Sequence, residues 1–393
     1  MKFSSLTDRI AGEGAEAWVT HFQAVERKAQ GEDIIILSVG DPNFDTPTAI
    51  VDAAVAALRG GDTHYAPVEG REPLRQAIVD QYRAQSGFAA QADNVVVVAG
   101  AQCALYATAQ CLFEAGDEVV VPEPMYVTYQ AAIGSSGARL KPVALRADRD
   151  FALQVEDIAA AITPHTRGIA INSPQNPTGR MLGEAQWRGI AELCRKHDLW
   201  LISDEVYSRF CYSAKDFFPV TLPGMAERTV VLNSLSKSHA MTGWRLGWAI
   251  CPPQLAKHMG NLALCMLYGS PGFVQEAARV ALTRCDADVE TMRREYLARR
   301  DLVCAALGSV PGLKIIRPDA GMFIMLGIEG TGLTTADFLR RLLDERGVSV
   351  LDGAAFGPSA AGYVRISLAV SAAELQDACH RIRDFVISLT EKR

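Results

Sequence analysis

The chain has 393 residues, of which 49% are hydrophobic and 21% charged, with a formal net charge of -6 and a pI near 5.7. These values are typical of a globular protein of about two or three domains with a large buried core. The acidic balance disfavours nucleic acids and anionic membranes as partners, because both select basic surfaces. No apolar run is long enough to span a bilayer, and the first residues lack the apolar core of a signal peptide.

The cysteines also carry information about the compartment. There are nine, an odd number, and none are spaced as C-x-x-C. We therefore expect reduced, mostly buried thiols in a cytoplasmic protein, with neither a disulfide framework nor a metal site.

Helical and strand patterns alternate along residues 49–250. We expect helices over residues 49–58, 72–83, 101–114, 125–134, 155–161 and 183–197. We expect strands over residues 94–99, 118–121, 140–143, 168–172, 200–203, 229–233 and 246–250. Uninterrupted apolar strands between helices predict an α/β fold with a mostly parallel sheet, covered by helices on both faces. Ligand sites in such sheets lie beyond the carboxyl ends of the strands, so the residues after each strand are the functional candidates.

The last third has a different pattern, which predicts a second, smaller α+β domain. It begins with a charged helical stretch over residues 286–307, whose charges we expect on a solvated face. Further expected elements are strands over 313–317, 322–326 and 363–368 and helices over 335–346 and 373–390. Because the N-terminal segment is expected to pack with this part, the predicted large domain is 45–285 and the predicted small domain combines 1–44 and 286–393.

Lys237 lies in an unusual setting for a lysine. Between Ser234 and Gly247 its neighbours are mostly small or hydroxyl-bearing, and Arg245 follows shortly after. A lysine that forms a Schiff base with an aldehyde cofactor needs small neighbours, and hydroxyls with a guanidinium can hold the phosphate of that cofactor. Ser234 and Ser236 are the hydroxyl candidates. We therefore expect Lys237 to carry pyridoxal 5′-phosphate in an enzyme that acts on amino acids.

Two further motifs follow predicted strands. Asn176 stands in a turn rich in proline and glycine, which would hold its amide in one place; an ordinary surface turn is the alternative. Asp204 comes at the end of a strand, with Tyr207 three residues later. A buried carboxylate pairs well with a protonated pyridine nitrogen, which makes the ring an electron sink. The alternative role for Asp204 is to cap a helix.

Three other positions complete the predicted site. Ala101 and Gln102 begin a helix directly after a strand, where free N–H groups suit a phosphate. Tyr126 follows another strand end and is a candidate to stack on the pyridine ring, the alternative being a packed core residue. Arg365 lies inside an apolar strand and needs an anion, either a substrate carboxylate or a structural ion-pair partner.

Together these motifs resemble the fold-type-I, pyridoxal-phosphate-dependent aminotransferases of class I/II, the aspartate-aminotransferase-like group. The resemblance runs along nearly the whole chain and includes residues 38–42, 65–70, 74–75, 176–179 and 204–207, besides the segment around Lys237 and Arg365. It implies transfer of an amino group from an L-amino acid to a 2-oxo acid by a ping-pong mechanism. It also implies a homodimer with shared active sites, in which Tyr65 reaches the phosphate in the neighbouring subunit.

The resemblance implies a role for each candidate residue. Lys237 attaches the cofactor and moves the proton, and Asp204 pairs with the pyridine nitrogen. Tyr207 and Asn176 hold the ring oxygen, and Tyr126 stacks on the ring. The phosphate ligands that it implies are Ala101, Gln102, Ser234, Ser236 and Arg245. The substrate-carboxylate ligands that it implies are Arg365, Asn176 and the backbone of Gly40.

Within this family, four stretches are most similar to bacterial arginine–pyruvate transaminases, namely residues 99–106, 123–129, 261–271 and 355–362. This similarity implies arginine as amino donor and pyruvate as acceptor. A guanidinium substrate needs an acidic or aromatic receiver, for which Glu13, Glu16 and Asp41 are candidates. Members specific for aspartate need a second cation for the distal carboxylate, and the sequence identifies none.

Four alternative functions stay open at this point. The chain could be specific for aspartate or another amino acid, or it could be a carbon–sulfur β-lyase, which shares nearly all of these residues. A regulatory module on the same scaffold would not need the complete set of Lys237, Asp204 and Arg245. A nicotinamide dehydrogenase would share the alternating layers, but the chain lacks the glycine fingerprint of a dinucleotide site.

Overall fold

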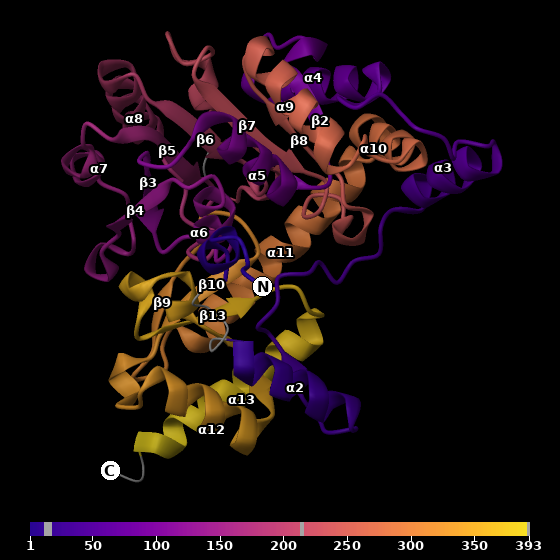
Figure 1. Ribbon diagram of the computed structural model, residues 1–393. Helices are drawn as coiled ribbons and strands as arrows, with labels where there is room; N and C mark the ends of the chain where they lie inside the picture. The colour runs from indigo at the N-terminus through magenta and orange to yellow at the C-terminus, as the bar shows by residue number, and fades with distance from the viewer. Residues whose placement is uncertain (12–17, 213–215, 391–393) are drawn as a thin grey trace.

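The computed structural model describes residues 1–11, 18–212 and 216–390. A seven-stranded sheet runs through its larger part (Figure 1). The strands are β2 (Val95–Val98), β3 (Glu118–Glu123), β4 (Arg139–Ala144), β5 (Thr166–Asn172), β6 (Trp200–Asp204), β7 (Thr229–Ser234) and β8 (Gly247–Ile250). Their order is β2-β8-β7-β6-β5-β3-β4, and all neighbours pair in parallel except β8, which is antiparallel to β2 and β7. The predicted fold class is therefore confirmed.

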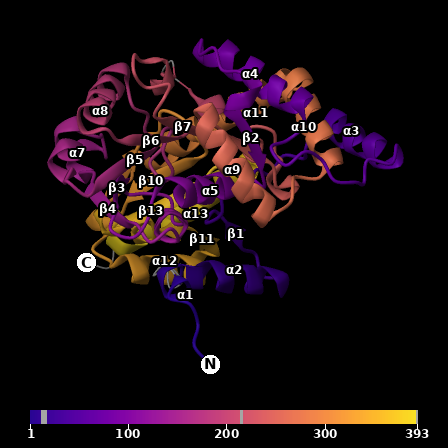
Figure 2. The ribbon, with the colours of Figure 1, turned by 45° about the horizontal axis from the view of Figure 1, so that its top comes forward.

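Helices cover both faces of this sheet, which explains its uninterrupted apolar strands. They are α3 (Thr48–Arg59), α4 (Glu72–Ser86), α5 (Ala101–Leu112), α6 (Tyr129–Gly134), α7 (Val155–Ala161), α8 (Glu184–His197), α9 (Pro253–Met266) and α10 (Gly272–Arg284). In β2, Val95 and Val97 pack with α4 and α10, whereas Val96 and Val98 pack with α5 and α9, as the two-residue period of a strand requires. Figures 1 and 2 show α3, α4 and α10 at the β2 end of the sheet and α7 and α8 near β4 and β5.

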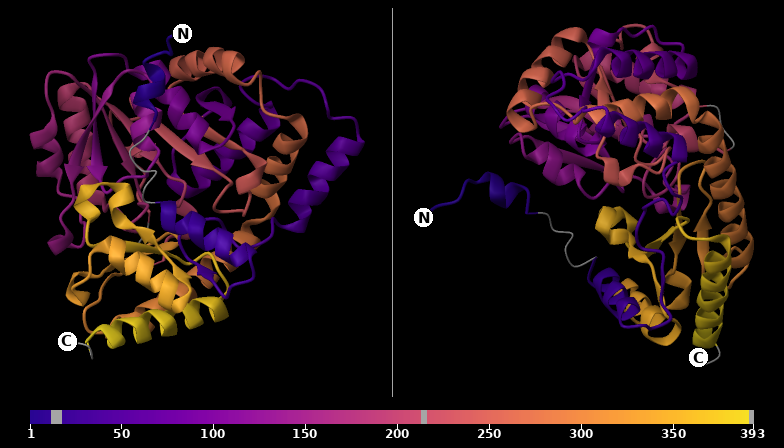
Figure 3. Two further views of the ribbon diagram at one scale, coloured as in Figure 1. Left: turned by 60° about the horizontal axis from the view of Figure 1, so that its bottom comes forward. Right: turned by 90° about the vertical axis from the view of Figure 1, so that its right-hand side faces the viewer.

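The C-terminal third forms a four-stranded antiparallel sheet with its own helices. The strands are β9 (Lys314–Ile316), β10 (Phe323–Gly327), β12 (Leu351–Asp352) and β13 (Tyr363–Ser367), in the order β12-β13-β10-β9. The helices are α11 (Asp286–Leu307), α12 (Thr335–Arg346) and α13 (Ala372–Thr390). Figure 3 shows α12 and α13 side by side below this sheet.

The N-terminal segment joins this smaller part. It contains α1 (Leu6–Arg9), α2 (Val19–Ala29) and β1 (Ile35–Ile36), and β1 pairs in parallel with β11 (Val348–Ser349). Leu37 packs in the same hydrophobic cluster as the strands of the small sheet. Among the helices in the described ranges, none combines the length and apolar character that crossing a lipid bilayer requires.

Two expectations from the sequence need correction. The helix expected from residue 125 begins only at Tyr129, because Met125 donates its backbone N–H across to the carbonyl of Phe356 instead of entering a helix. The charges of α11 do not all lie on a solvated face. Arg299 and Arg300 are buried, because their guanidinium groups bind backbone carbonyls and lie over aromatic rings.

The sheet brings distant residues together at the carboxyl ends of its central strands. Asn172 at the end of β5 pairs with Asp204 at the end of β6, and Asp204 does not cap a helix. The next strand, β7, ends at Ser234, three residues before Lys237. The turns after β5, β6 and β7 therefore meet at one edge of the sheet, as expected for a parallel arrangement.

Gly247, the first residue of β8, offers a test of this packing. A Cβ atom there would lie 2.5 Å from the backbone nitrogen of Ala101 and 2.8 Å from the carbonyl oxygen of Asn233. Because backbone atoms cannot move aside as a side chain can, we expect Gly247→Ala to lower the free energy of unfolding by about 1–3 kcal/mol. Gly243→Ala is the control, since a Cβ there meets nothing within 4 Å. Chemical denaturation of both variants measures the effect, and equal stability would contradict this packing.

Candidate active site

Two adjoining cavities lie at the carboxyl edge of the large sheet. The first, of about 220 Å³, lies over the ends of β5, β6 and β7, and the second, of about 330 Å³, extends from it to the small sheet. The predicted residues in the first are Ala101, Gln102, Tyr126, Asn176, Asp204, Tyr207, Ser234, Ser236, Lys237 and Arg245. Gly40 and Arg365 line the second, which also contains Tyr126, Asn176, Tyr207 and Lys237. Of the predicted site residues that the structure describes, it therefore gathers all except Tyr65.

Lys237 lies between the two cavities. Its Nζ donates a hydrogen bond of 2.7 Å to the carbonyl oxygen of Gly40, which belongs to the N-terminal segment. Burial lowers the pKa of Lys237 to about 8, and the nearby charge of Asp41 opposes that shift. A substantial fraction of this amine is therefore neutral, and so nucleophilic, near neutral pH.

Asp204 is a buried carboxylate held by neutral donors. The Tyr129 hydroxyl donates to its Oδ2 at 2.6 Å, and the backbone N–H of Val206 donates to its Oδ1 at 3.3 Å. Within the described ranges it forms no ion pair, and burial raises its pKa to about 6. A cationic group in the first cavity would therefore be stabilised beside Asp204, as a protonated ring nitrogen would be.

Arg365 is the counterpart of Asp204 in the second cavity. Its guanidinium donates to Asn176 Oδ1 at 2.9 Å and to the carbonyl oxygen of Ser38 at 2.8 Å, and lies over the rings of Phe323 and Phe356. It has no carboxylate partner in the part of the chain that the structure describes, and burial lowers its pKa to about 10. The structural ion pair considered from the sequence is thus not found there, and a bound carboxylate would supply the missing charge.

Asn176 and Tyr207 border both cavities. The turn that holds Asn176 is buried, and its backbone N–H donates to Asn172 Oδ1 at 2.7 Å, so it is not an ordinary surface turn. Tyr207 is also buried, and burial raises the pKa of its hydroxyl, which therefore stays protonated as a hydrogen-bond donor.

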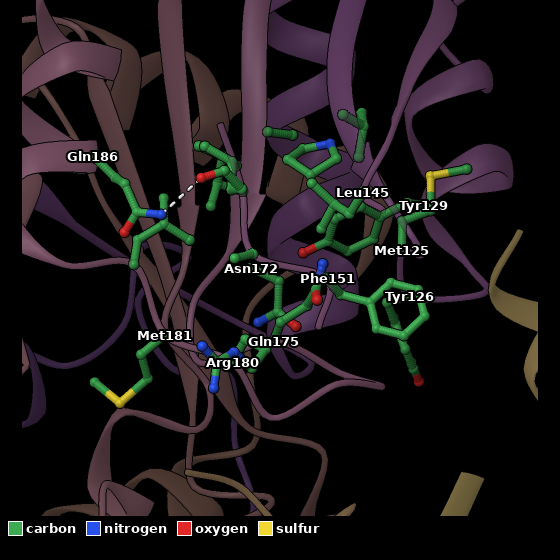
Figure 4. Close-up of a pocket in the computed structure, with 17 residues that line it drawn as sticks. Met125, Tyr126, Tyr129, Leu145, Phe151, Asn172, Gln175, Arg180, Met181 and Gln186 are labelled. Carbon is green, nitrogen blue, oxygen red and sulfur yellow. Dashed lines mark hydrogen bonds between the residues drawn. The ribbon is translucent and has the colours of Figure 1, made fainter. Parts of the chain in front are cut away.

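A third, smaller cavity of about 90 Å³ adjoins the site, and Tyr126 and Tyr129 are among the residues that line it. Their rings meet edge to face at a centroid distance of 6.2 Å, and Figure 4 shows both with Asn172 at the border of this cavity. Tyr126 packs against the hydrophobic core and also lines the first cavity, so its place in the core is confirmed and its stacking on a ring stays a prediction.

An anion cradle closes the far end of the first cavity. Helix α5 begins there with Ala101, and Arg245 donates from its two terminal nitrogens to the carbonyl oxygens of Thr242 and Ala99. Gly100 leaves the space that this arginine needs, since a Cβ there would lie 2.6 Å from Arg245 Nη2. Helix N–H groups, a guanidinium and the hydroxyls of Ser234 and Ser236 form a donor set suited to a phosphate.

The structure also identifies site residues that the sequence analysis missed. They are Tyr129, which holds Asp204, and four residues of the cavity walls, namely Trp18, Thr242, Phe323 and Phe356. Trp18 comes from the N-terminal segment and Phe323 and Phe356 from the smaller C-terminal part, and no local motif marks these three. The repeated tyrosine at positions 126 and 129 was a signal that could have drawn attention to Tyr129.

Tyr65 lies away from both cavities. Its side chain is 85% exposed and packs against Tyr268, at a ring distance of 4.7 Å, in a separate surface hollow. Two of the three candidates for binding a guanidinium, Glu13 and Glu16, lie outside the described residues. The third, Asp41, lines the second cavity.

Comparison with known proteins gives a consistent result. The sequence profile of the family "Aminotransferase class I and II" matches residues 32–382. The arginine–pyruvate transaminase of Pseudomonas aeruginosa is 56% identical over 97% of both chains, and an aspartate aminotransferase of Pyrococcus horikoshii is 37% identical over 91% of this chain and 92% of its own. Among solved structures, the aspartate aminotransferase of Thermus thermophilus with maleate superposes with a TM-score of 0.92 at 32% identity, covering 98% of this chain and 99% of its own.

The pKa of Lys237 makes a prediction for the cofactor-free protein. Below about pH 8 the protonated, unreactive amine predominates, and above it the neutral amine predominates. The rate at which Lys237 reacts with an added aldehyde should therefore rise with pH and level off above a midpoint near 8. Borohydride trapping and peptide mapping measure that rate for Lys237 and, as an internal control, for exposed lysines. A midpoint near 10.5, the ordinary value for a lysine, would contradict the burial of this amine.

The setting of Arg365 makes a second prediction. Arg365→Lys keeps the charge but loses the two-pronged donor, so the KM for the amino acid should rise by about 10- to 100-fold, as expected for loss of a charge-assisted hydrogen bond. Arg299→Lys is the matched control, because Arg299 is equally buried but donates to Asn43 and Leu368 away from the cavities. Steady-state kinetics measure the KM of both variants. An unchanged KM in Arg365→Lys would show that Arg365 does not bind the substrate.

Proposed function

Because this chain belongs to the class I and II aminotransferase family and is a transaminase, we propose that it uses pyridoxal 5′-phosphate attached to Lys237. The observation that carries this proposal is the combination of a buried lysine, an unpaired buried carboxylate at Asp204 and a phosphate cradle around one cavity. Each matches one chemical group of that cofactor: the aldehyde, the ring nitrogen and the phosphate. When bound, the cofactor supplies an electron sink for the bond that breaks at the substrate Cα.

The residues of the chain then divide the remaining work. Arg365 binds the substrate carboxylate and so fixes the direction of the Cα–H bond. The neutral Nζ of Lys237 accepts the Cα proton and later returns it. Asp204 would hold the protonated ring nitrogen of the bound cofactor, and Tyr207 and Asn176 would donate hydrogen bonds to its ring oxygen. A second 2-oxo acid reverses the sequence, which gives a ping-pong reaction.

We further propose L-arginine as the amino donor and pyruvate as an acceptor. The Pseudomonas aeruginosa relative, at 56% identity, carries that activity in its name. The charged residues that line the two cavities also support L-arginine as the amino donor. Among the described residues that line them, the lysines and arginines are Lys237, Arg245 and Arg365, and each already has a role. A donor with a second carboxylate, such as aspartate, would find no further cation there.

The oligomeric state and the division of the chain into domains are further proposals. We propose a cytoplasmic homodimer in which the exposed Tyr65 enters the phosphate cradle of the second subunit. We also propose that residues 45–285 form the cofactor-binding domain and that 1–44 and 286–393 form the small domain. β1 of the N-terminal segment pairs with β11 of the C-terminal part, far away in the chain. This pairing supports the assignment of residues 1–44 to the small domain.

The amino donor and the reaction type are tested together. We expect L-arginine with pyruvate to give the largest kcat/KM in a panel of amino acids that includes aspartate, glutamate, alanine and cysteine, with pyruvate and 2-oxoglutarate as acceptors. Chromatography of the products measures the 2-oxo acid formed. Turnover without any acceptor would indicate a β-lyase, and preference for aspartate would contradict the proposed donor.

A further inference from the structure

The second cavity contains one acidic wall residue that the proposed roles leave unused. Asp41 is the acidic residue among the described residues that line this cavity, and its side chain is exposed at the opening. The Thr242 hydroxyl donates to its Oδ1 at 2.8 Å, and Thr242 itself lines both cavities. Within the described ranges Asp41 forms no ion pair, so its second carboxylate oxygen stays available to a ligand.

Asp41 lies close enough to Arg365 for one bound amino acid with a long side chain to contact both residues. The carbonyl of Ser38 accepts from Arg365, the carbonyl of Gly40 accepts from Lys237, and Asp41 follows at once. Three residues span at most about 10 Å. A donor held by its α-carboxylate at Arg365 and by its reacting carbon at Lys237 can therefore place a long side chain beside Asp41.

Trp18 adds an aromatic wall to the same cavity. It precedes α2, is partly buried, and packs edge to face against His21 at a ring distance of 5.5 Å. A flat guanidinium can stack on an indole face while it donates to a carboxylate, and these two interactions are the ones that distinguish arginine from neutral side chains of equal length.

We propose that Asp41 and Trp18 bind the distal guanidinium of the amino donor and so select a cationic amino acid. This inference rests on the proposed function, because it assumes a donor held by Arg365 and processed at Lys237. Asp41 belongs to the segment whose Ser38 and Gly40 carbonyls accept hydrogen bonds from Arg365 and Lys237. The same segment would therefore also select the amino donor. Selection by charge would then occur beside the reacting groups, at the opening of the cavity.

The test compares L-arginine with L-citrulline, which has the same length and shape but a neutral end group. In Asp41→Asn we expect the ratio of kcat/KM for arginine to kcat/KM for citrulline to fall by roughly tenfold, mainly because the KM for arginine rises. Trp18→Leu should reduce arginine use similarly, and Trp18→Phe should restore part of it, because phenylalanine keeps an aromatic face. Asp45→Asn is the matched control, since Asp45 is exposed on the same segment but does not line either cavity.

A binding measurement separates recognition from catalysis. 5-Guanidinopentanoate has the carboxylate and the guanidinium of arginine but no α-amino group, so it cannot react. Calorimetry on the holoenzyme should show weaker binding of this compound to Asp41→Asn than to the wild type or Asp45→Asn. Comparison with citrulline also removes any general effect of Asp41 on Lys237, because such an effect would change both donors equally.

The outcomes distinguish the two proposals. If the wild type does not prefer arginine to citrulline, the proposed donor is wrong, whatever the variants do. If the wild type prefers arginine but Asp41→Asn keeps the same arginine-to-citrulline ratio and the same affinity for 5-guanidinopentanoate, the donor stands and the role of Asp41 is overturned. A collapse of that ratio in Asp41→Asn but not in Asp45→Asn supports the inference.

Discussion

Two buried charges without counter-ions in the described chain are the constraint on which this site depends. Asp204 and Arg365 are 8% and 4% exposed, and both are held by neutral groups: a tyrosine hydroxyl, an asparagine amide and a backbone carbonyl. Such burial costs several kcal/mol per ion unless an opposite charge arrives. The pKa of Asp204 rises to about 6 and that of Arg365 falls to about 10, both toward the neutral form. A bound cation at one and a bound carboxylate at the other would reverse both shifts.

The alternation of side chains along the chain at the end of β6 decides which of two neighbouring carboxylates faces the site. Asp204 and Glu205 are neighbours in sequence, but their side chains point to opposite faces. Asp204 meets Tyr129 and the first cavity, whereas Glu205 accepts from Ser203 and from Tyr82 of α4 on the other side. Burial among these groups raises the pKa of Glu205 well above its usual range. One residue of this acidic pair is therefore available to a ligand, and the other is part of the packing between sheet and helices.

The small sheet and the N-terminal segment contribute walls of the second cavity. Arg365 comes from β13, Phe323 from β10, and Gly40 and Asp41 from the segment after β1. The large sheet, by contrast, supplies the lysine, the carboxylate and the phosphate cradle. The two groups of residues meet at Lys237, Asn176, Tyr207 and Tyr126, which line both cavities.

Much of this architecture could be predicted from the sequence, because it depends on local patterns. Apolar strands between helices determined the α/β class, and Lys237, Asp204, Asn176 and Arg365 stood out because small, rigid or apolar neighbours are unusual around polar groups. Trp18 and the phenylalanines over Arg365 have no such local mark, and Tyr129 is marked only by a second tyrosine three residues before it. Their positions depend on strand order and on the docking of the small sheet, which join residues such as Tyr129 and Asp204, 75 positions apart, and Ser38 and Arg365, 327 positions apart. The sequence by itself therefore determined which chemistry the chain contains, and the tertiary structure decided which side chains surround it, because contacts between distant segments arise only when the two sheets pack.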